Sequence, residues 1–264
     1  MKRKHRSPWA PLYLTLVLVL LYLPIVVVVL YSFNANTSRY PNEFTGFSLQ
    51  FYEALLRDTK GLLAALQNSL LLAVCSCGIS MVIGTLGAVG LSLRRFKGQG
   101  LVETLTILPI MVPEIILGMA FMAVFTAVGL RFGMLTLVLS HVTFCTPYIF
   151  IIVQGRLAGM DPSLTEASRD LGASPARTFF EITLPLILPG VLSGVMLAFA
   201  MSLDDFVISF FVTGATTTTL PLKIYSSVKT GVSLQVNALC TLMLAFVAIV
   251  MAIKQLVVDR RANG

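Results

Sequence analysis

Long apolar segments recur along the whole chain and constrain its fold more than any other feature. Only 12% of the 264 residues are charged, whereas a soluble domain carries roughly 25%. Each segment has the length of about 20 residues that a helix needs to cross a bilayer. We therefore predict an all-α, polytopic membrane protein with six transmembrane helices, forming a single transmembrane domain over residues 1–264. The six predicted spans are 11–33, 68–92, 101–128, 134–154, 186–212 and 237–257.

The lysines and arginines predict how these spans are oriented. Thirteen of the 19 basic residues fall in segments on one side, namely the tail 1–10, residues 94–97, residues 155–185 and the C-terminus. The positive-inside rule makes that side cytoplasmic. Both termini and the 155–185 insert are then inside, while the loops 34–67 and 214–235 face outward. The net charge of +7 comes from these cytoplasmic basic residues, which set the orientation of the spans in the lipid membrane. It therefore does not indicate a nucleic-acid partner.

The N-terminal basic tail and first apolar run resemble a signal peptide. The run is longer than an h-region of about 7–15 residues, so we interpret it as a retained first span. All four cysteines lie inside apolar segments and are interpreted as packing residues rather than metal ligands: Cys75, Cys77, Cys145 and Cys240. Six helices rarely enclose a solute pathway, which favours a second membrane chain. Chemistry that needs a large water-facing site, such as nucleotide hydrolysis, must come from another chain.

The polar insert between the fourth and fifth spans is predicted to be a pair of short helices. Asp161-Pro162 is a capping start for the first, and Gly172 ends it. Ser174-Pro175 begins the second, which leads to Pro185 and the fifth span. The first helix is too short to be stable alone in water. It needs a surface, which is either the membrane with neighbouring loops or a partner protein.

The spacing in this insert resembles the EAA-type loop of ABC importer permeases. Glu166-Ala167-Ser168 is followed after three residues by Gly172, and after nine more by Ile182-Thr183-Leu184-Pro185. Only Ser168 departs from the pattern, where the family has alanine. The resemblance implies a type-1 importer permease fold and a coupling helix that sits in a groove of a cytoplasmic ATPase subunit. The implied ATPase-coupling residues are Leu164, Glu166, Ala167, Ser168, Gly172, Ile182, Leu184 and Pro185.

The resemblance also implies a separate role for each of these residues. Leu164 and Ala167 would be apolar contacts in the groove, and Glu166 would make a polar contact or cap its own helix. Gly172 would supply the bend, and Pro185 would set how the short helix is geared to the fifth span. ATP-Mg would be used by the partner ATPase, so no cofactor is expected on this chain.

Three acidic residues within the predicted spans are candidates for a solute pathway. Glu114 lies ~20 Å along the third span from its cytoplasmic end, just after Pro113. Asp204 and Asp205 lie ~27 Å along the fifth. Adjacent helical residues are about 100° apart, so at most one of this pair points straight into a pathway. Ionisable groups at such depth usually face a cavity or a partner, and this acidic ladder suits a cation such as a polyamine. The alternative is that these acids hold helices together.

Most of the chain, over residues 10–257, is similar to the second permease subunit of spermidine/putrescine importers. The segments that carry this resemblance are SFNAN at 32–36, LPIMVPEIILG at 108–118, SHVTFCTPYI at 140–149, SLDDFVISFFVTG at 202–214 and TLPLKIYSSVKTGVSLQVNAL at 219–239. It implies a heterodimer with a second permease, two ATPase subunits and an extracytoplasmic substrate-binding protein at a bacterial inner membrane. It further implies transport without catalytic residues on this chain.

Other functions remain open at this stage. The same importer class could carry another small solute, such as another amine, an opine or an organophosphonate. A proton-coupled secondary transporter would also place acids and His141 in its spans, but it would not need the EAA-type loop. A membrane enzyme would require a polar cluster of recognisable spacing. For His141 itself, a hydrogen bond to a neighbouring helix is favoured over a proton relay.

Overall fold

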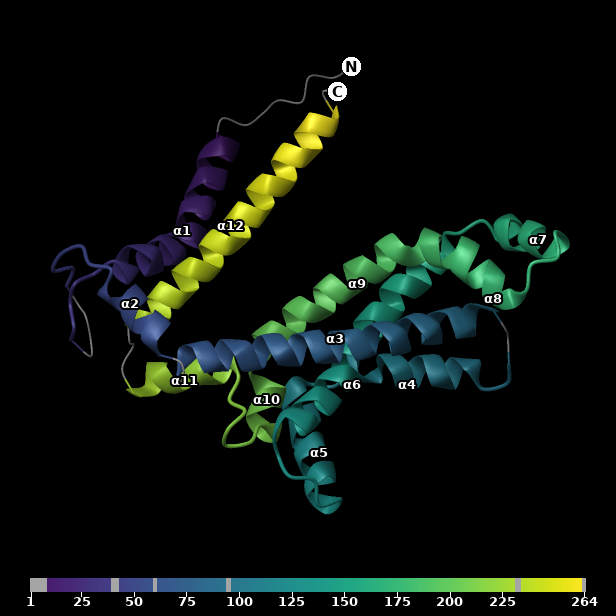
Figure 1. Cartoon of the computed structure of the whole chain (residues 1–264), viewed down its shortest axis with the longest axis horizontal. Coiled ribbons are helices and arrows are strands. Elements are labelled where there is room, and N and C mark those ends of the chain that lie inside the picture. The colour runs from purple at the N-terminus through teal and green to yellow at the C-terminus, as the bar shows by residue number, and fades with distance from the viewer. Residues whose placement is uncertain (1–8, 39–42, 59–60, 94–95, 231–233, 263–264) are drawn as a thin grey trace. The chain divides into compact units, whose positions relative to one another are not determined.

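The computed structural model describes residues 9–38, 43–58, 61–93, 96–230 and 234–262, and every regular element in this part of the chain is a helix (Figure 1). The predicted basic tail up to Pro8 and the Arg94–Arg95 pair lie outside the described residues. Five helices could each cross a membrane by length and composition, or six if one bent pair counts as a single span. The chain divides into two compact units, 1–64 with 224–264, and 65–223. The single transmembrane domain over residues 1–264 stays a prediction.

The first unit is built on two long apolar helices. The helix α1 (Trp9–Ser32) packs along α12 (Leu234–Ala262), and the short α2 (Gln50–Arg57) also packs on α12. The chain after α1 folds around Asn34, whose side chain is fully buried. Its amide donates to the Glu43 carbonyl at 2.8 Å and accepts from the Thr45 amide at 3.0 Å. These bonds satisfy a buried polar group and fix the loop that precedes α2.

The second unit is centred on α6 (Met134–Ala158), which is the fourth predicted span. It packs against α9 (Leu184–Asp204), and α3 (Leu62–Leu93) also lies close to it. Gly84 of α3 and Gly194 of α9 make these approaches close. A Cβ at Gly194 would lie 3.1 Å from the Ile149 Cα, and one at Gly84 would lie 3.1 Å from the Thr146 carbonyl oxygen. Small residues at helix contacts are typical of membrane bundles.

The third predicted span is broken at Pro113. It consists of α4 (Gln99–Met111) and α5 (Glu114–Ala127), which meet at an angle of 108°. Val112 between them is extended, as residues before a proline prefer to be. Pro113 has no N–H for an α4 hydrogen bond and instead starts α5. The depth counted for Glu114 stays a prediction: the count follows α4 as far as Met111, and Glu114 then begins a new direction of the chain.

The fifth predicted span is also interrupted. The helix α9 ends at Asp204, Asp205 is extended, and α10 (Val207–Val212) follows. The argument from adjacent positions on one continuous helix was wrong, since only Asp204 belongs to α9. At its other end, α9 is continuous with the insert through α8 (Pro175–Thr178) and a π-helical turn, η1 (Phe179–Thr183). The second insert helix and the fifth span thus form one continuous helical segment, Pro175–Asp204.

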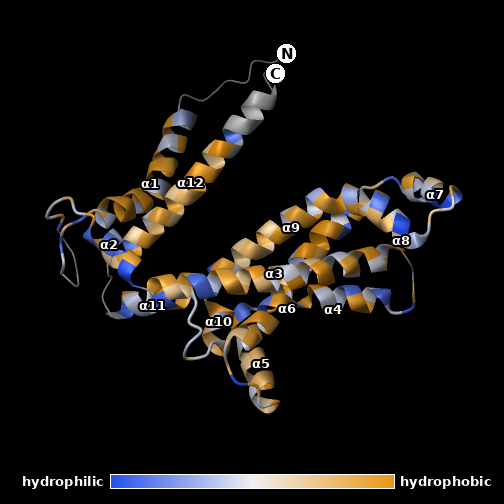
Figure 2. Ribbon diagram, viewed as in Figure 1, coloured by the Kyte–Doolittle hydropathy of each residue, from blue (hydrophilic) through white to orange (hydrophobic). Residues whose placement is uncertain are grey.

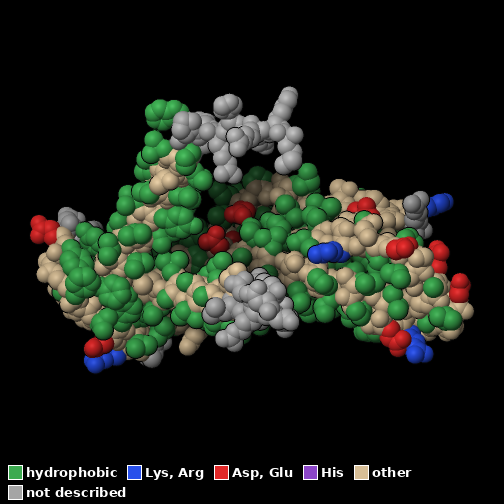
Figure 3. Space-filling view, turned by 90° about the horizontal axis from the view of Figure 1, so that it is seen from above, with side chains coloured by type: hydrophobic (Ala, Val, Ile, Leu, Met, Phe, Trp, Pro, Cys, Tyr) green, Lys and Arg blue, Asp and Glu red, His purple; other side chains and the backbone are tan. Residues whose placement is uncertain are grey.

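The helices differ in polarity as the sequence predicts. Figure 2 shows hydrophobic residues dominating the long helices and hydrophilic ones concentrated around α8 and the neighbouring α7 (Pro162–Asp170). Figure 3 shows a face on which hydrophobic side chains cover much of the surface while charged ones occur in small separate groups. The short helices α2 and α11 (Leu220–Thr230) lie in the predicted outer loops and were not anticipated.

Candidate functional site

The coupling loop begins with the capped helix that the sequence predicts. The Asp161 side chain accepts a hydrogen bond from the Ser163 amide at 3.0 Å, which lowers the pKa of this carboxyl. Gly172 ends the segment with φ +82°, a left-handed conformation that favours glycine. Ser174 accepts from the Arg177 amide at 3.3 Å and starts α8. The predicted caps and the predicted bend are therefore confirmed.

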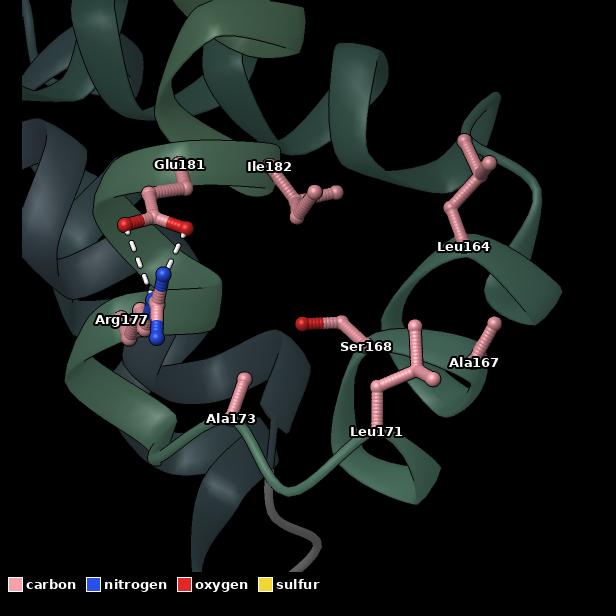
Figure 4. A pocket seen from close by; sticks show the side chains of 8 residues that line it. All are labelled: Leu164, Ala167, Ser168, Leu171, Ala173, Arg177, Glu181 and Ile182. Carbon is pink, nitrogen blue, oxygen red and sulfur yellow. Dashed lines mark hydrogen bonds and ion pairs between the residues drawn. The ribbon is translucent and has the colours of Figure 1, made fainter.

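Between α7 and the α8–η1 segment lies a cavity of about 390 Å³ (Figure 4). Four of the predicted coupling residues line it, and four others join them: Leu164, Ala167, Ser168, Ile182, and then Leu171, Ala173, Arg177 and Glu181. Its apolar members are open to solvent, and Leu171 is 89% exposed. An open apolar hollow at the end of a polar loop has the form of a docking surface.

The other predicted coupling residues lie outside this cavity. Glu166 is exposed on α7 and Pro185 is exposed in the first turn of α9. Leu184 is half-buried and packs on the core of the second unit. The loop therefore has an outer part that is free to bind and an inner part, at Leu184, that is anchored to the bundle.

Two polar contacts in the loop were missed by the sequence reasoning. The Ser168 and Thr178 hydroxyls lie 3.0 Å apart and link α7 to α8. Ser168 is the position that departs from the EAA pattern, so the departure itself was the available signal. Arg177 Nε donates to both Glu181 oxygens at 2.9 and 3.0 Å. This pair is well exposed, so it contributes little to stability.

The three predicted acidic residues come together in one small pocket of the second unit. A hollow of about 140 Å³ is lined by Glu114, Asp204, Asp205, Phe144, Met201, Phe206 and Val207. The breaks in the third and fifth spans make this possible, because Glu114 begins α5 and the two aspartates lie at the α9–α10 junction. Of the aromatic residues near these acids, Phe206 lines the pocket, whereas Tyr148 and Phe210 do not. No lysine or arginine of the described chain lines it.

The three carboxylates differ in their surroundings. Glu114 and Asp204 are exposed, and neither has a hydrogen-bond or ion-pair partner among the described residues. Asp205 is buried, and its two oxygens accept from the Ile208 amide at 3.1 Å and the Ser209 amide at 2.8 Å. Free carboxylates at Glu114 and Asp204 leave acceptor oxygens that a cationic group can use.

His141 makes the hydrogen bonds to neighbouring helices that the sequence analysis favoured. The ring is fully buried on α6. Its Nδ1 lies 2.8 Å from the Ser202 hydroxyl of α9, and its Nε2 lies 3.2 Å from the Ser209 hydroxyl of α10. Nε2 also lies 3.4 Å from an Asp205 oxygen. The cysteines are all free, and the described residues hold no group of three or more His, Cys, Asp or Glu that could bind a metal.

A broken-span bundle with an EAA-type loop defines the class of protein, and comparison with known families agrees. The chain belongs to the family of binding-protein-dependent transport system inner membrane components, whose model matches residues 80–264. It is accordingly a multi-pass inner membrane protein and the membrane-spanning permease of a transport system. The recognition of an ABC importer permease from the sequence is confirmed.

Two relatives whose names state a transported solute are similar to most of this chain. The chain is 41% identical to the putrescine transport system permease protein PotI of Escherichia coli K12 over 93% of this chain and 89% of PotI. It is 40% identical to the spermidine/putrescine permease PotC of the same organism, over 87% of this chain and 86% of PotC. A solved bacterial ABC transporter for the import of alginate matches with a TM-score of 0.74 at 14% identity, covering 98% of this chain and 99% of the other. This last likeness supports the fold, and the predicted all-α permease fold is confirmed.

Proposed function

We propose that the chain is the permease subunit of an ATP-driven importer that moves polyamines, spermidine or putrescine, into the cytoplasm by alternating access. The observation that carries this proposal is the gathering of Glu114, Asp204 and Asp205 around one pocket. PotI and PotC, the relatives whose names specify these cargoes, are similar over most of the chain.

The pocket's charge favours an amine over the other solutes considered. A polyamine carries ammonium groups along an apolar chain, so carboxylates and aromatic faces suit both of its parts. An opine or an organophosphonate carries anionic groups, which two unpaired carboxylates would repel. The EAA-type loop argues against a proton-coupled secondary transporter, which has no need of a docking surface for an ATPase.

The coupling loop supplies the proposed link to ATP. An ATPase subunit would receive α7 in its groove, and ATP-Mg would be bound and hydrolysed by that subunit. The continuous helical connection through α8 and η1 into α9 supports transmission of such a movement to the pocket at the far end of α9. The complete system would contain a second, different permease, two ATPase copies and an extracytoplasmic binding protein. Both termini and the loop would lie in the cytoplasm.

The decisive experiment is uptake of labelled putrescine and spermidine in cells that carry this chain with its natural neighbours. A strain with only this chain deleted is the matched control, and unlabelled putrescine, spermidine and a neutral amino acid serve as competitors. Uptake that requires the chain and is blocked by polyamines alone is the expected result. Uptake that is unchanged by the deletion, or blocked by the amino acid, would refute the polyamine assignment.

A further inference from the structure

We infer that His141 is a positioning residue, which fixes the break between α9 and α10 so that the carboxylates of Asp204 and Glu114 face the ammonium group of the cargo. The inference rests on the proposed polyamine import and divides the acidic pocket into two roles. Asp205 anchors the broken helix, and Asp204 with Glu114 receives the cation.

The first step is that Asp205 has little capacity left for a cargo. Both of its oxygens are engaged by amide groups at the start of α10, in the manner of a helix cap. One oxygen also lies 3.4 Å from His141 Nε2. A cargo that took Asp205 would have to release the first turn of α10, in a chain where buried backbone groups need partners. The adjacent residue, Asp204, has no hydrogen-bond or ion-pair partner among the described residues, so its carboxylate can bind a cargo without releasing α10.

The second step is that His141 touches both sides of the break. Ser202 lies on α9 before the interruption, and Ser209 lies on α10 after it. With a proton on Nε2, the ring donates toward Ser209 and Asp205, while Nδ1 accepts from the Ser202 hydroxyl. The Ser202 hydroxyl is in turn 3.4 Å from that of Ser76 on α3. One buried imidazole of α6 thus contacts both sides of the break, α9 through Ser202 and α10 through Ser209.

The third step connects this anchor to Glu114. The helix α5 packs on α10, and Gly118 is a point of close approach between them. A Cβ at Gly118 would lie 2.6 Å from the Phe211 ring and 3.4 Å from the Ile208 Cα. Glu114 stands one helical turn before Gly118 on the same face of α5. The contacts that fix α10 therefore also fix α5, and with it the position of Glu114 in the pocket that Asp204 lines.

The test is a double-variant cycle measured as labelled putrescine uptake by the complete transporter, with the membrane level of each variant quantified. In the wild-type background, Asp204→Asn should lower uptake roughly tenfold, the worth of one charge-assisted contact. His141→Leu should lower it by a similar factor. If His141 acts by placing Asp204, the double variant should be little worse than either single variant.

Two further variants supply a partial rescue and a matched control. His141→Gln retains an amide that can bond to Ser209 and should recover part of the uptake lost in His141→Leu. Thr143→Val on the same helix is the matched control, because within the described residues the Thr143 hydroxyl bonds only to the Leu139 carbonyl of its own helix. It should transport at the wild-type rate. If His141→Leu fails to reach the membrane, the cycle is run with His141→Gln in its place.

The outcomes are distinguishable. Multiplicative losses in the double variant would overturn the positioning role, and so would wild-type uptake by His141→Leu. Asp205→Asn replaces one of the two oxygens that accept from the start of α10, so it should lower the melting temperature of the purified protein, whereas Asp204→Asn should leave it unchanged. Equal melting temperatures in the two variants would overturn the division of roles. If the wild-type transporter itself takes up no putrescine or spermidine, the proposed function fails, and the inference falls with it.

Discussion

Replacing Gly118 by alanine is the sharpest test of how the acidic pocket is built. In the structure, the added methyl group would lie 2.6 and 3.3 Å from two carbons of the Phe211 ring and 3.4 Å from the Ile208 Cα. Ordinary contacts between carbon atoms fall at about 3.5–4.0 Å. The helices α5 and α10 must therefore separate by roughly 1 Å, or the Phe211 ring must leave its place.

The size of the effect follows from this geometry. Overpacking of this kind typically costs about 1–3 kcal/mol, which for a chain of this length corresponds to a fall of roughly 2–12 °C in melting temperature. A shift on the order of 1 Å in a preorganised site can also lower a rate by up to about a hundredfold. Since this chain would supply only one wall of the pathway, we expect putrescine uptake to fall roughly tenfold.

The matched control is Gly78→Ala in α3, where an added Cβ meets nothing within 4 Å. Both variants gain the same helix propensity, about 1 kcal/mol over glycine, so the difference between them isolates the clash. The purified protein is melted in detergent, and uptake is measured in cells at matched membrane levels. If Gly118→Ala is as stable and as active as Gly78→Ala, the close packing of α5 on α10 is refuted.

Three further changes test the coupling loop. Glu166→Arg reverses an exposed charge on α7 and should reduce uptake to background while an immunoblot still finds the chain in the membrane; normal uptake would contradict docking through this helix. Ser168→Ala, Thr178→Val and their double variant each remove one 3.0 Å bond, so all three should lower uptake per ATP hydrolysed by the same factor of about two; unequal losses would show that the bond is not shared. The lowered pKa of Asp161 means that its cap is present above the unfolded value of about 3.9 and is lost as the pH falls through the folded value. Protection of the loop from proteolysis should therefore be constant from about pH 8 to about pH 5, equal in Asp161→Asn and weaker in Asp161→Ala, and a decline within that range would contradict the cap.

The coupling loop could be read from the sequence because its determinants are local. Asp161, Gly172 and Ser174 specify the caps and the bend through contacts with residues only two or three positions away. The apolar segments likewise specify their own helices, since a bilayer leaves a chain few alternatives. What the sequence reasoning missed in this loop was the link between Ser168 and Thr178, two residues that meet only once both short helices have formed.

The acidic pocket was decided by the tertiary structure. The sequence alone placed Glu114, Asp204 and Asp205 in long apolar segments and indicated a cation. It did not reveal that the fifth span breaks after Asp204, or that Asp205 is engaged at the start of α10 while Asp204 is free. The amides that engage Asp205 are only three and four positions away, but they reach it because the helix breaks there. The two sides of that break also contact His141, more than 60 residues away in the chain. A segment's polarity and caps are determined by its neighbouring residues, but the position at which a long apolar span breaks, and so which acid is left free, is decided by how the helices pack.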